Sequence, residues 1–300
     1  MNYIDIIKKI SNKSFNSSNG WELMTDKLRD YLENEDINLY YYNCIQPQVF
    51  HWPQDAKQCM IQLLVLEQNK NNIFYKTIIK KNNYGPSGIK LYKNVQLDRV
   101  NHTWSIYNMV EILKLNLSSN NEIIFEFGGG TGQMADILNE LNFRGIHIVY
   151  DLPLMTILQK KFIDKINIQN EHILDNEYIS LTNKTYYLPC NQSDSEKQII
   201  NLPNLNFIAT YSLTETDNET HKKFAKYMKN FSRIFIIYWP QPCPMFNNIN
   251  NEEYIQEIKK NIEDTHNCYI GSNYAYTAGN TFYAIKKDLM KEEIIPPIGI

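Results

Sequence analysis

The chain has 300 residues, and 43% of them are hydrophobic, which is enough for one large domain or two smaller ones with a sizeable core. The net charge is -3 and Lys and Arg are scattered along the sequence, so no basic footprint stands out and we expect no nucleic-acid partner. The apolar runs are far shorter than the roughly 20 residues that cross a bilayer, and the N-terminus does not resemble a secretory signal, so we expect a cytoplasmic protein without a membrane span.

The first part of the chain, residues 1–115, has apolar residues at helical spacing and is expected to be a mostly helical region that contributes to substrate binding. Within it, the polar segment 82–93 holds two glycines and a proline. This composition is typical of a loop, and we expect the loop to lie over a ligand.

The pattern changes at residue 123 to short apolar runs that alternate with helical periods, which indicates β-α units and a mostly parallel sheet. We expect an α/β domain over residues 116–290 and a C-terminal tail at 291–300. Strands are predicted at residues 123–127, 146–150, 185–188, 207–211 and 234–238, with a closing antiparallel pair at 268–274 and 281–285. Helices are predicted after the first, second and fourth strands and at 252–265, and the third of these helices begins at the capping box Thr216–Glu219.

Four of the 11 glycines follow the first predicted strand within five positions: Gly128, Gly129, Gly130 and Gly132. Open α/β sheets bind ligands where a parallel strand gives way to a helix, and glycines let the backbone approach a ligand there. A phosphate-binding P-loop is excluded because Gln133 and Met134 stand where Lys and Ser or Thr are needed. A dinucleotide fingerprint is disfavoured because its third glycine would fall at Gln133. A tight turn without a ligand remains the alternative.

An acid precedes these glycines, and the pattern Glu126-x-Gly-x-Gly-x-Gly resembles the first motif of Rossmann-like S-adenosylmethionine-dependent methyltransferases. The resemblance implies S-adenosylmethionine as cofactor, with Glu126 and backbone carbonyls facing its ammonium and sulfonium groups. A second acid, at the tip of the second strand, would accept hydrogen bonds from both ribose hydroxyls, and Asp151 stands there. The alternative role of Asp151 is to cap the helix that begins near Pro153. The other residues expected at the cofactor site are Gln133, Leu152, Asn191, Tyr211 and Ser212.

Three segments together resemble the bacterial sugar O-methyltransferase family: FEFGGGTGQMADIL, VYDLP and FIATYSLTETDNETHKKF. The D-L-P element is also similar to small-molecule O-methyltransferases of the plant type. The resemblance implies a seven-stranded Rossmann-like methyltransferase sheet, parallel with one antiparallel strand. It also implies methyl transfer to a hydroxyl of a sugar or a nucleotide- or lipid-linked sugar, in surface polysaccharide biosynthesis. The residues 240–244 would border this acceptor, and aromatic residues of the N-terminal region would stack on it: Tyr40, Tyr41, Tyr42, Trp52 and Trp104.

Plant-type enzymes place a catalytic histidine just after the fourth strand, where this sequence has Thr214 followed by Glu215. Glu215 is therefore the candidate general base for the acceptor hydroxyl, with a solvent-facing acid as the alternative reading. His102 is a second candidate because it lies shortly before the first strand and would sit above the cofactor. His221 is a third, although its place in the first turns of a helix favours an exposed position over catalysis. We expect His147 to be structural, and the remaining histidines have no chemical context: His51, His172 and His266.

The five cysteines contain no Cys-x-x-Cys pair, and no Asp/His set has metal-ligand spacing, so we expect reduced thiols and no metal site. Three rival functions remain: an O-methyltransferase of another small molecule, a catalytically silent protein that binds the cofactor, and a nicotinamide-dependent oxidoreductase. The identity of the acceptor and a homo-oligomeric state are both left open by the sequence.

Overall fold

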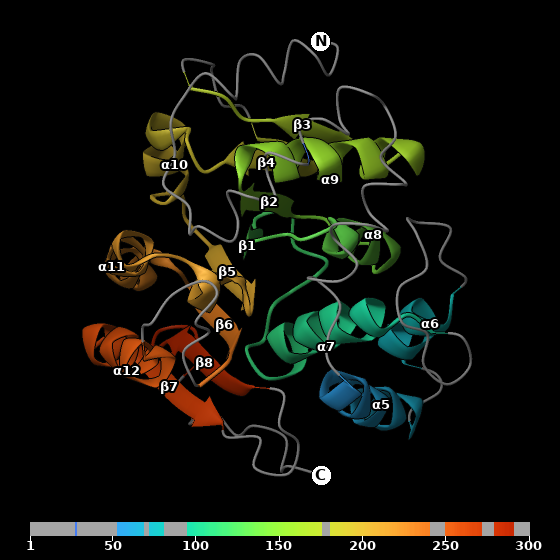
Figure 1. The fold of residues 1–300 in the computed structure, drawn as a ribbon, viewed down its shortest axis with the longest axis horizontal. Helices are drawn as coiled ribbons and strands as arrows, with labels where there is room; N and C mark the ends of the chain where they lie inside the picture. Colours follow the sequence, from blue (N-terminus) through green and yellow to red (C-terminus); the bar gives the residue numbers. More distant parts are fainter. Residues whose placement is uncertain are drawn as a thin grey trace.

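The computed structural model describes residue 28 and residues 53–68, 72–80, 95–175, 181–240, 250–271 and 279–290 (Figure 1). The following predictions lie outside these residues: the loop at 82–93, the aromatic residues Tyr40, Tyr41, Tyr42 and Trp52, residues 241–244, His51 and the tail at 291–300.

One mixed sheet forms the centre of the molecule, and its strands follow the order β3-β4-β2-β1-β5-β6-β8-β7 (Figure 1). The strands are β1 (Ile123–Phe127), β2 (Ile146–Asp151), β3 (Asn170–His172), β4 (Thr185–Pro189), β5 (Leu205–Thr210), β6 (Arg233–Tyr238), β7 (His266–Gly271) and β8 (Asn280–Lys286). Within this sheet β8 pairs antiparallel with both β6 and β7, and the pairs among the other strands are parallel. The predicted α/β class with a mixed sheet is confirmed.

The predicted number of seven strands is wrong, because the described sheet has eight. Each of the seven predicted strands overlaps an observed one, and the additional strand is β3, which pairs with β4 at the sheet edge. Its sequence is only Asn-Glu-His, and one of its three residues is buried. A strand this short and polar has no apolar run or alternation, so the pattern used for the other strands does not detect it.

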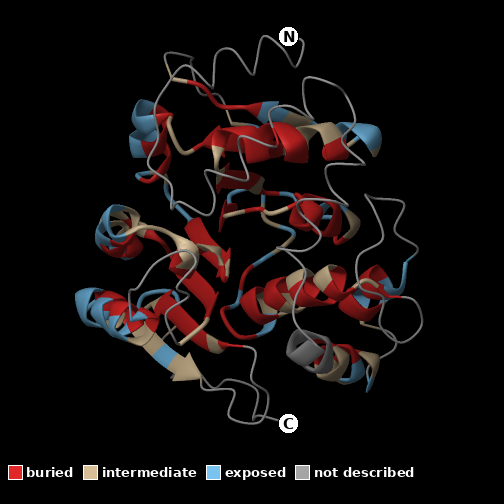
Figure 2. Cartoon of the chain, viewed as in Figure 1, coloured by how far each residue is buried: buried red, intermediate tan, exposed pale blue. Residues whose placement is uncertain are grey.

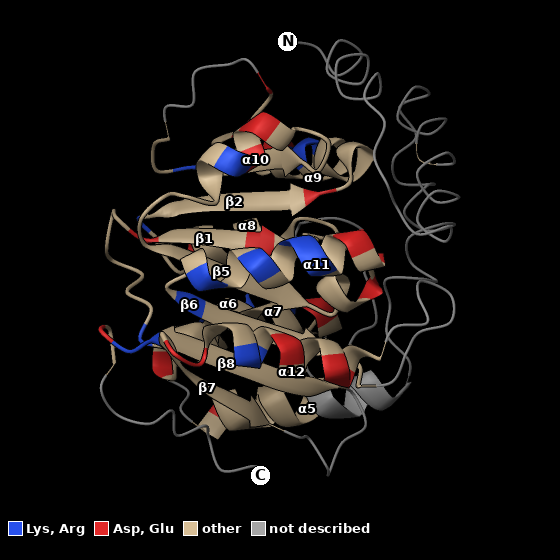
Figure 3. Cartoon of the chain, turned by 90° about the vertical axis from the view of Figure 1, so that its left-hand side faces the viewer, with Lys and Arg blue, Asp and Glu red and all other residues tan. Residues whose placement is uncertain are grey.

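Helices cover both faces of the sheet (Figure 1). On one face lie α10 (Ser193–Ile199), α11 (Asn218–Tyr227) and α12 (Asn251–Ile262), which are nearest the viewer in Figure 3. On the other face lie α5 (Pro53–Gln68), α6 (Ile73–Ile79), α7 (Leu97–Glu111), α8 (Gln133–Glu140) and α9 (Pro153–Lys165). Because both faces are covered, the central strands are buried along their length and read as continuous apolar runs (Figure 2).

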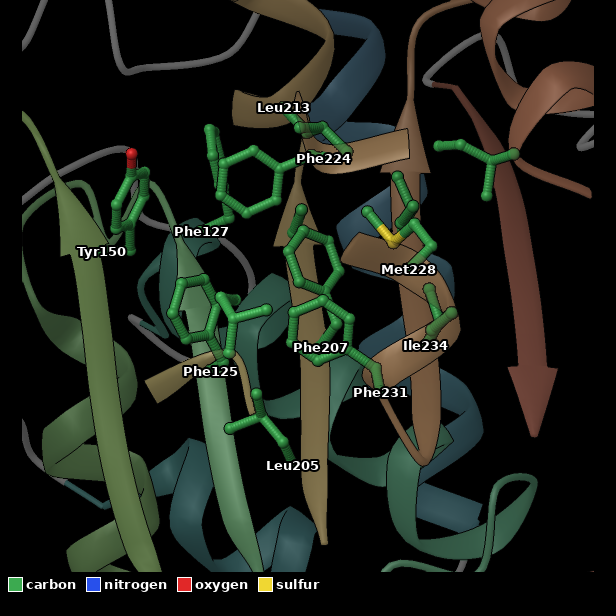
Figure 4. Close-up of a cluster of buried hydrophobic side chains, with 14 of the residues drawn as sticks. Phe125, Phe127, Tyr150, Leu205, Phe207, Leu213, Phe224, Met228, Phe231 and Ile234 are labelled. Carbon is green, nitrogen blue, oxygen red and sulfur yellow. The ribbon is translucent and has the colours of Figure 1, made fainter. Parts of the chain in front are cut away.

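The core beneath α11 is rich in aromatic rings (Figure 4). Alternate residues of β1 point to this side, so Phe125 and Phe127 pack against Phe207 of β5 and Phe224 of α11. The ring centroids of Phe127 and Phe224 are 4.7 Å apart in an edge-to-face contact. This packing fixes the end of β1, where the glycine-rich segment begins.

A buried arginine joins the N-terminal helices to α8. Arg99 of α7 is 1% exposed, and its guanidinium lies 2.6 Å from Asp136 and 2.6 Å from Glu140. Its Nε donates to the carbonyl of Thr77 at 2.9 Å, which adds α6 to the same contact.

The sequence predicted a mostly helical region over residues 1–115, and the helices α5, α6 and α7 agree with this prediction. A domain boundary near residue 115 stays a prediction.

Replacing Arg99 with alanine is expected to lower the free energy of unfolding by about 3 kcal/mol, because it leaves the carboxylate of Asp136 without its cation in a covered interface. Glu140 keeps only its ion pair with Lys80 at 2.9 Å. Urea unfolding would measure the change. The matched control is Arg144→Ala, since Arg144 is exposed and its loss should change stability by less than about 0.5 kcal/mol. Equal effects of the two substitutions would show that the buried ion pairs do not hold α7 on α8.

Candidate functional site

The predicted site lies where the sheet order reverses, at the carboxyl end of β1. Strand β1 has β2 on one side and β5 on the other, and the chain passes from it through residues 128–132 into α8. Crevices at such points bind ligands in open α/β sheets. The carboxyl ends of the parallel strands β1, β2, β4 and β5 meet at this edge, and the residues predicted to bind the cofactor follow or end these strands.

Gly128 and Gly130 have left-handed backbone conformations and differ in what a side chain there would meet. Gly128 has φ +72°, and a Cβ there would lie 2.3 Å from the Cβ of Ser212, so the loop could not approach the segment after β5. Gly130 has φ +54°, and a Cβ there would meet nothing within 4 Å. Gly128 therefore allows a close contact with Ser212, whereas the Cβ position of Gly130 is open.

Three buried oxygen atoms have no hydrogen-bond partner in the part of the chain that the structure describes, and they lie on residues that flank or contact the loop. They are Glu126 Oε1, Gln133 Oε1 and Gln159 Oε1. The second oxygen of Glu126 lies 3.0 Å from Nε2 of His147, and the amide of Gln133 donates to Gln96 at 3.1 Å. A buried acceptor without a donor costs on the order of 1–3 kcal/mol, so this set of oxygens suits a ligand that brings cations or hydrogen-bond donors.

Asp151 ends β2 beside the loop. Its Oδ1 accepts a hydrogen bond from the backbone N–H of Leu152 at 2.7 Å, and its Oδ2 accepts one from the side-chain amide of Gln159 at 2.6 Å. Burial raises the pKa of Asp151 to about 7, and these hydrogen bonds act in the opposite direction. The alternative that Asp151 caps α9 is wrong, because the N-cap position belongs to Leu152 and no side-chain cap bond is made there.

The remaining predicted cofactor residues lie along the same edge of the sheet. Asn191 follows β4, and its Oδ1 accepts from Gln192 at 3.0 Å. Tyr211 follows β5 with φ +68°, a backbone conformation that non-glycine residues rarely adopt. Ser212 donates its hydroxyl hydrogen to the carbonyl of Phe127, so the residue after the strained Tyr211 is tied to the end of β1.

Glu215, the predicted general base, is the last residue of the 3-10 helix η3 (Ser212–Glu215) and is half-buried. Two hydroxyls shape this turn: that of Thr214 donates to the carbonyl of Tyr211 at 2.8 Å, and that of Thr216 donates to the carbonyl of Leu213 at 2.8 Å. Glu215 thus sits on a fixed turn at the carboxyl end of β5.

The expectation that His221 is exposed is wrong, because it is 2% exposed. Its Nε2 donates to the carbonyl of Leu213 at 2.9 Å, and its ring stacks on Tyr254 of α12 with centroids 4.0 Å apart. Burial lowers the pKa of His221 to about 4, so the ring is neutral at pH 7. The spacing of His221, Phe224 and Met228 is that of one helix face, and this signal in the sequence pointed to burial.

The other candidate histidines occupy different places. His102 is half-buried in α7, the helix that begins just after Gln96, whose side chain contacts Gln133. His147 is buried in β2 between Glu126 and Thr185, which agrees with the expected structural role.

Within the described ranges, no group of three or more His, Cys, Asp or Glu side chains is placed to hold a metal ion. In the same ranges, no helix is long and apolar enough to cross a membrane.

Sequence reasoning missed Gln159, which contacts both the loop and Asp151. It lies on the buried face of α9 with Met155 and Phe162, at spacings of four and three residues. A polar residue on an otherwise apolar helix face was the available signal, because such a side chain needs a buried partner.

No family model matches the sequence, and no curated protein matches it. Among solved structures, the chain is similar to an rRNA methylase from Streptococcus thermophilus, with 10% identity, a TM-score of 0.40, and 57% of this chain and 89% of that chain covered. A SAM dependent methyltransferase from Aquifex aeolicus has 16% identity and a TM-score of 0.34 over 59% of this chain and 92% of its own. MtNAS, solved in complex with MTA and tNA, has 11% identity and a TM-score of 0.41 over 95% of this chain and 90% of its own. Likenesses this low carry no conclusion about function.

Proposed function

We propose that the protein is an S-adenosylmethionine-dependent methyltransferase. The observation that carries the proposal is a glycine loop with open space at the Cβ position of Gly130, together with buried acceptor oxygens that have no donor among the residues that the structure describes. The ammonium and sulfonium groups of the cofactor are cations, and its ribose hydroxyls and adenine amino group are donors. The residues present therefore fit this ligand in both space and charge.

Each predicted cofactor residue has a role in this proposal. Glu126, buried beneath the loop, supplies negative charge for the cationic methionine end. Asp151 accepts hydrogen bonds from the ribose hydroxyls, since a carboxylate has about four lone-pair sites and the protein donors do not exhaust them. The other residues along this edge border the same ligand: Gly128, Gly129, Gly130, Gly132, Gln133, Leu152, Asn191, Tyr211 and Ser212.

When bound, S-adenosylmethionine supplies an electrophilic methyl group on a positively charged sulfur. The protein has to hold the acceptor in line with that group and receive the proton of its hydroxyl. We assign the proton to the carboxylate of Glu215. His221 and Thr216 both donate to the carbonyl of Leu213, and this holds the turn that carries Glu215. His102 is the alternative proton acceptor.

The proposed acceptor is a hydroxyl of a sugar or sugar conjugate, in surface polysaccharide biosynthesis. Support comes from the sequence resemblance and from aromatic surfaces on the α7 side of the sheet. Trp104 stacks on Tyr107 at 5.2 Å, and Tyr211 stacks on Trp239 at 4.9 Å, where both Trp side chains are half-buried. Sugar rings bind to such faces through their C–H groups. A panel of sugar and phenol acceptors, scored for methylated product, separates this acceptor class from other small molecules.

Calorimetric titration with S-adenosylhomocysteine tests the cofactor assignment, with NAD as the parallel control. We expect binding of the first ligand in the micromolar range and no heat from the second. Binding of NAD alone would favour an oxidoreductase. Binding of neither would leave the glycines as a tight turn and overturn the proposed function. Binding of S-adenosylhomocysteine without turnover of any acceptor would favour a catalytically silent protein.

A further inference from the structure

Gln159 connects two parts of the candidate site that come from different strands. It lies in α9, is 0% exposed, and its Nε2 donates to the carbonyl of Gly130 at 3.0 Å and to Oδ2 of Asp151 at 2.6 Å. Gly130 belongs to the loop after β1, and Asp151 ends β2. A single amide group therefore fixes the position of the loop relative to the carboxylate.

The orientation of this amide follows from its partners. Both Gly130 O and Asp151 Oδ2 are acceptors, so the nitrogen of the amide has to face them. The same nitrogen would lie 3.1 Å from a Cβ at Gly129, which shows how closely the side chain approaches the loop. The oxygen of the amide is buried without a partner among the described residues, so the donor side of the group is used in preference to the acceptor side.

We propose that Gln159 is a positioning residue, which holds the glycine loop and the Asp151 carboxylate in the arrangement that receives the ribose and methionine ends of the ligand. The inference rests on the proposed function, because it assumes that Asp151 binds ribose hydroxyls. It adds a residue on α9 to a site that sequence patterns confine to the ends of strands. Gln159 acts through Asp151 and the loop.

Burial and the charges around Asp151 disfavour its ionised form, which a hydrogen-bond donor stabilises. Glu126 of β1 raises the pKa of Asp151 through its negative charge, and the thiol of Cys190 after β4 lies close enough to interact with the same carboxylate. His147 of β2 is paired with Glu126. The Gln159 hydrogen bond stabilises the ionised form of Asp151 against this burial and repulsion, and the ionised form is the stronger acceptor for hydroxyls.

The test is calorimetric titration of the full chain with S-adenosylhomocysteine between pH 5.5 and 8.5. Gln159→Met keeps the length of the side chain and removes the donor. We expect it to weaken binding by about tenfold at pH 8, because a hydrogen bond to a charged group is lost. The pH at which half of the maximal affinity is reached should rise by about one unit, since Asp151 becomes harder to ionise. Gln159→Glu should raise that pH further, because it places a second carboxylate beside Asp151.

Gln198→Met on α10 is the matched control, because Gln198 is exposed and should leave affinity and pH profile unchanged. A Gln159→Met protein with the affinity and the pH midpoint of the parent would overturn the inference. So would a loss of affinity that is equal at every pH, which indicates a merely structural role. If Gln159→Met fails to fold, the pH profile of Gln159→Glu decides in the same way. Failure of the parent to bind at any pH would instead contradict the proposed function.

Discussion

Glu215→Gln is expected to lower kcat by about 100- to 10,000-fold, because the variant retains the shape of the side chain and loses the carboxylate that receives the acceptor proton. Affinity for S-adenosylhomocysteine should stay within about twofold of the parent, since the cofactor assignments involve other residues. Steady-state assays with the acceptor found in the panel would measure kcat, and calorimetry would measure the affinity for S-adenosylhomocysteine. A loss of kcat with intact cofactor binding is the pattern of a group that acts on the acceptor.

Glu219→Gln is the control for this experiment. Glu219 lies four residues further along the chain in the first turn of α11 and is exposed, so its substitution should leave kcat unchanged. If Glu215→Gln turns over as fast as the parent, Glu215 is not the base, and His102→Ala becomes the next substitution to measure. If Glu215→Gln also lowers the folding stability, Glu215 stabilises the conformation of η3.

The parts of the fold that follow from local sequence were predicted well. β1 was placed at its observed bounds because its apolar run is continuous and ends at the glycines, and both features lie within ten residues of each other. Asp151 was placed at the end of β2 for the same reason. Because β1 and β2 are parallel neighbours, their carboxyl ends bring these two segments together, so both segments contribute to one site.

The parts that sequence reasoning missed depend on contacts between distant residues. Arg99 is fully buried because Asp136 and Glu140 on another helix neutralise it, and nothing near Arg99 in the sequence indicates those partners. Gln159 contacts the glycine loop across 29 residues of sequence, so its role depends on how α9 packs beside the loop. The expectation that His221 is exposed came from its place in the first turns of a helix, whereas its helical spacing from Phe224 indicated the buried face.

The strained backbone of Tyr211 shows how these distant contacts serve the site. A positive φ at a bulky residue costs on the order of 1–3 kcal/mol and persists only where the surroundings enforce it. The N–H of Tyr211 donates to the carbonyl of Ile237 at 2.7 Å, and its own carbonyl accepts from Thr214 at 2.8 Å. The turn that results directs Ser212 back to the carbonyl of Phe127 and begins the segment that carries Glu215.

Replacing Asp151 with alanine is expected to weaken S-adenosylhomocysteine binding by at least about 100-fold, because hydrogen bonds from ribose hydroxyls to a carboxylate are charge-assisted. The pH dependence gives a second and sharper readout. Since the pKa of Asp151 is raised to about 7 by burial, the carboxylate of the free protein gains a proton as the pH falls through 7. If the ligand binds the ionised form, affinity should be constant well above pH 7 and fall about tenfold for each unit below it.

Asp151→Asn separates charge from hydrogen bonding in this prediction. The amide keeps an acceptor oxygen and does not titrate, so we expect binding that is weaker than in the parent at pH 8 and no longer falls between pH 7 and 5.5. The control Asp194→Asn changes an exposed acid at the start of α10 and should retain the pH profile of the parent. A parent protein whose affinity does not change between pH 5.5 and 8 would contradict the role of Asp151, since protonation of this carboxylate should weaken binding. A steep profile that disappears in Asp151→Asn would tie the ligand to this carboxylate, and with it to the loop that Gln159 holds beside it.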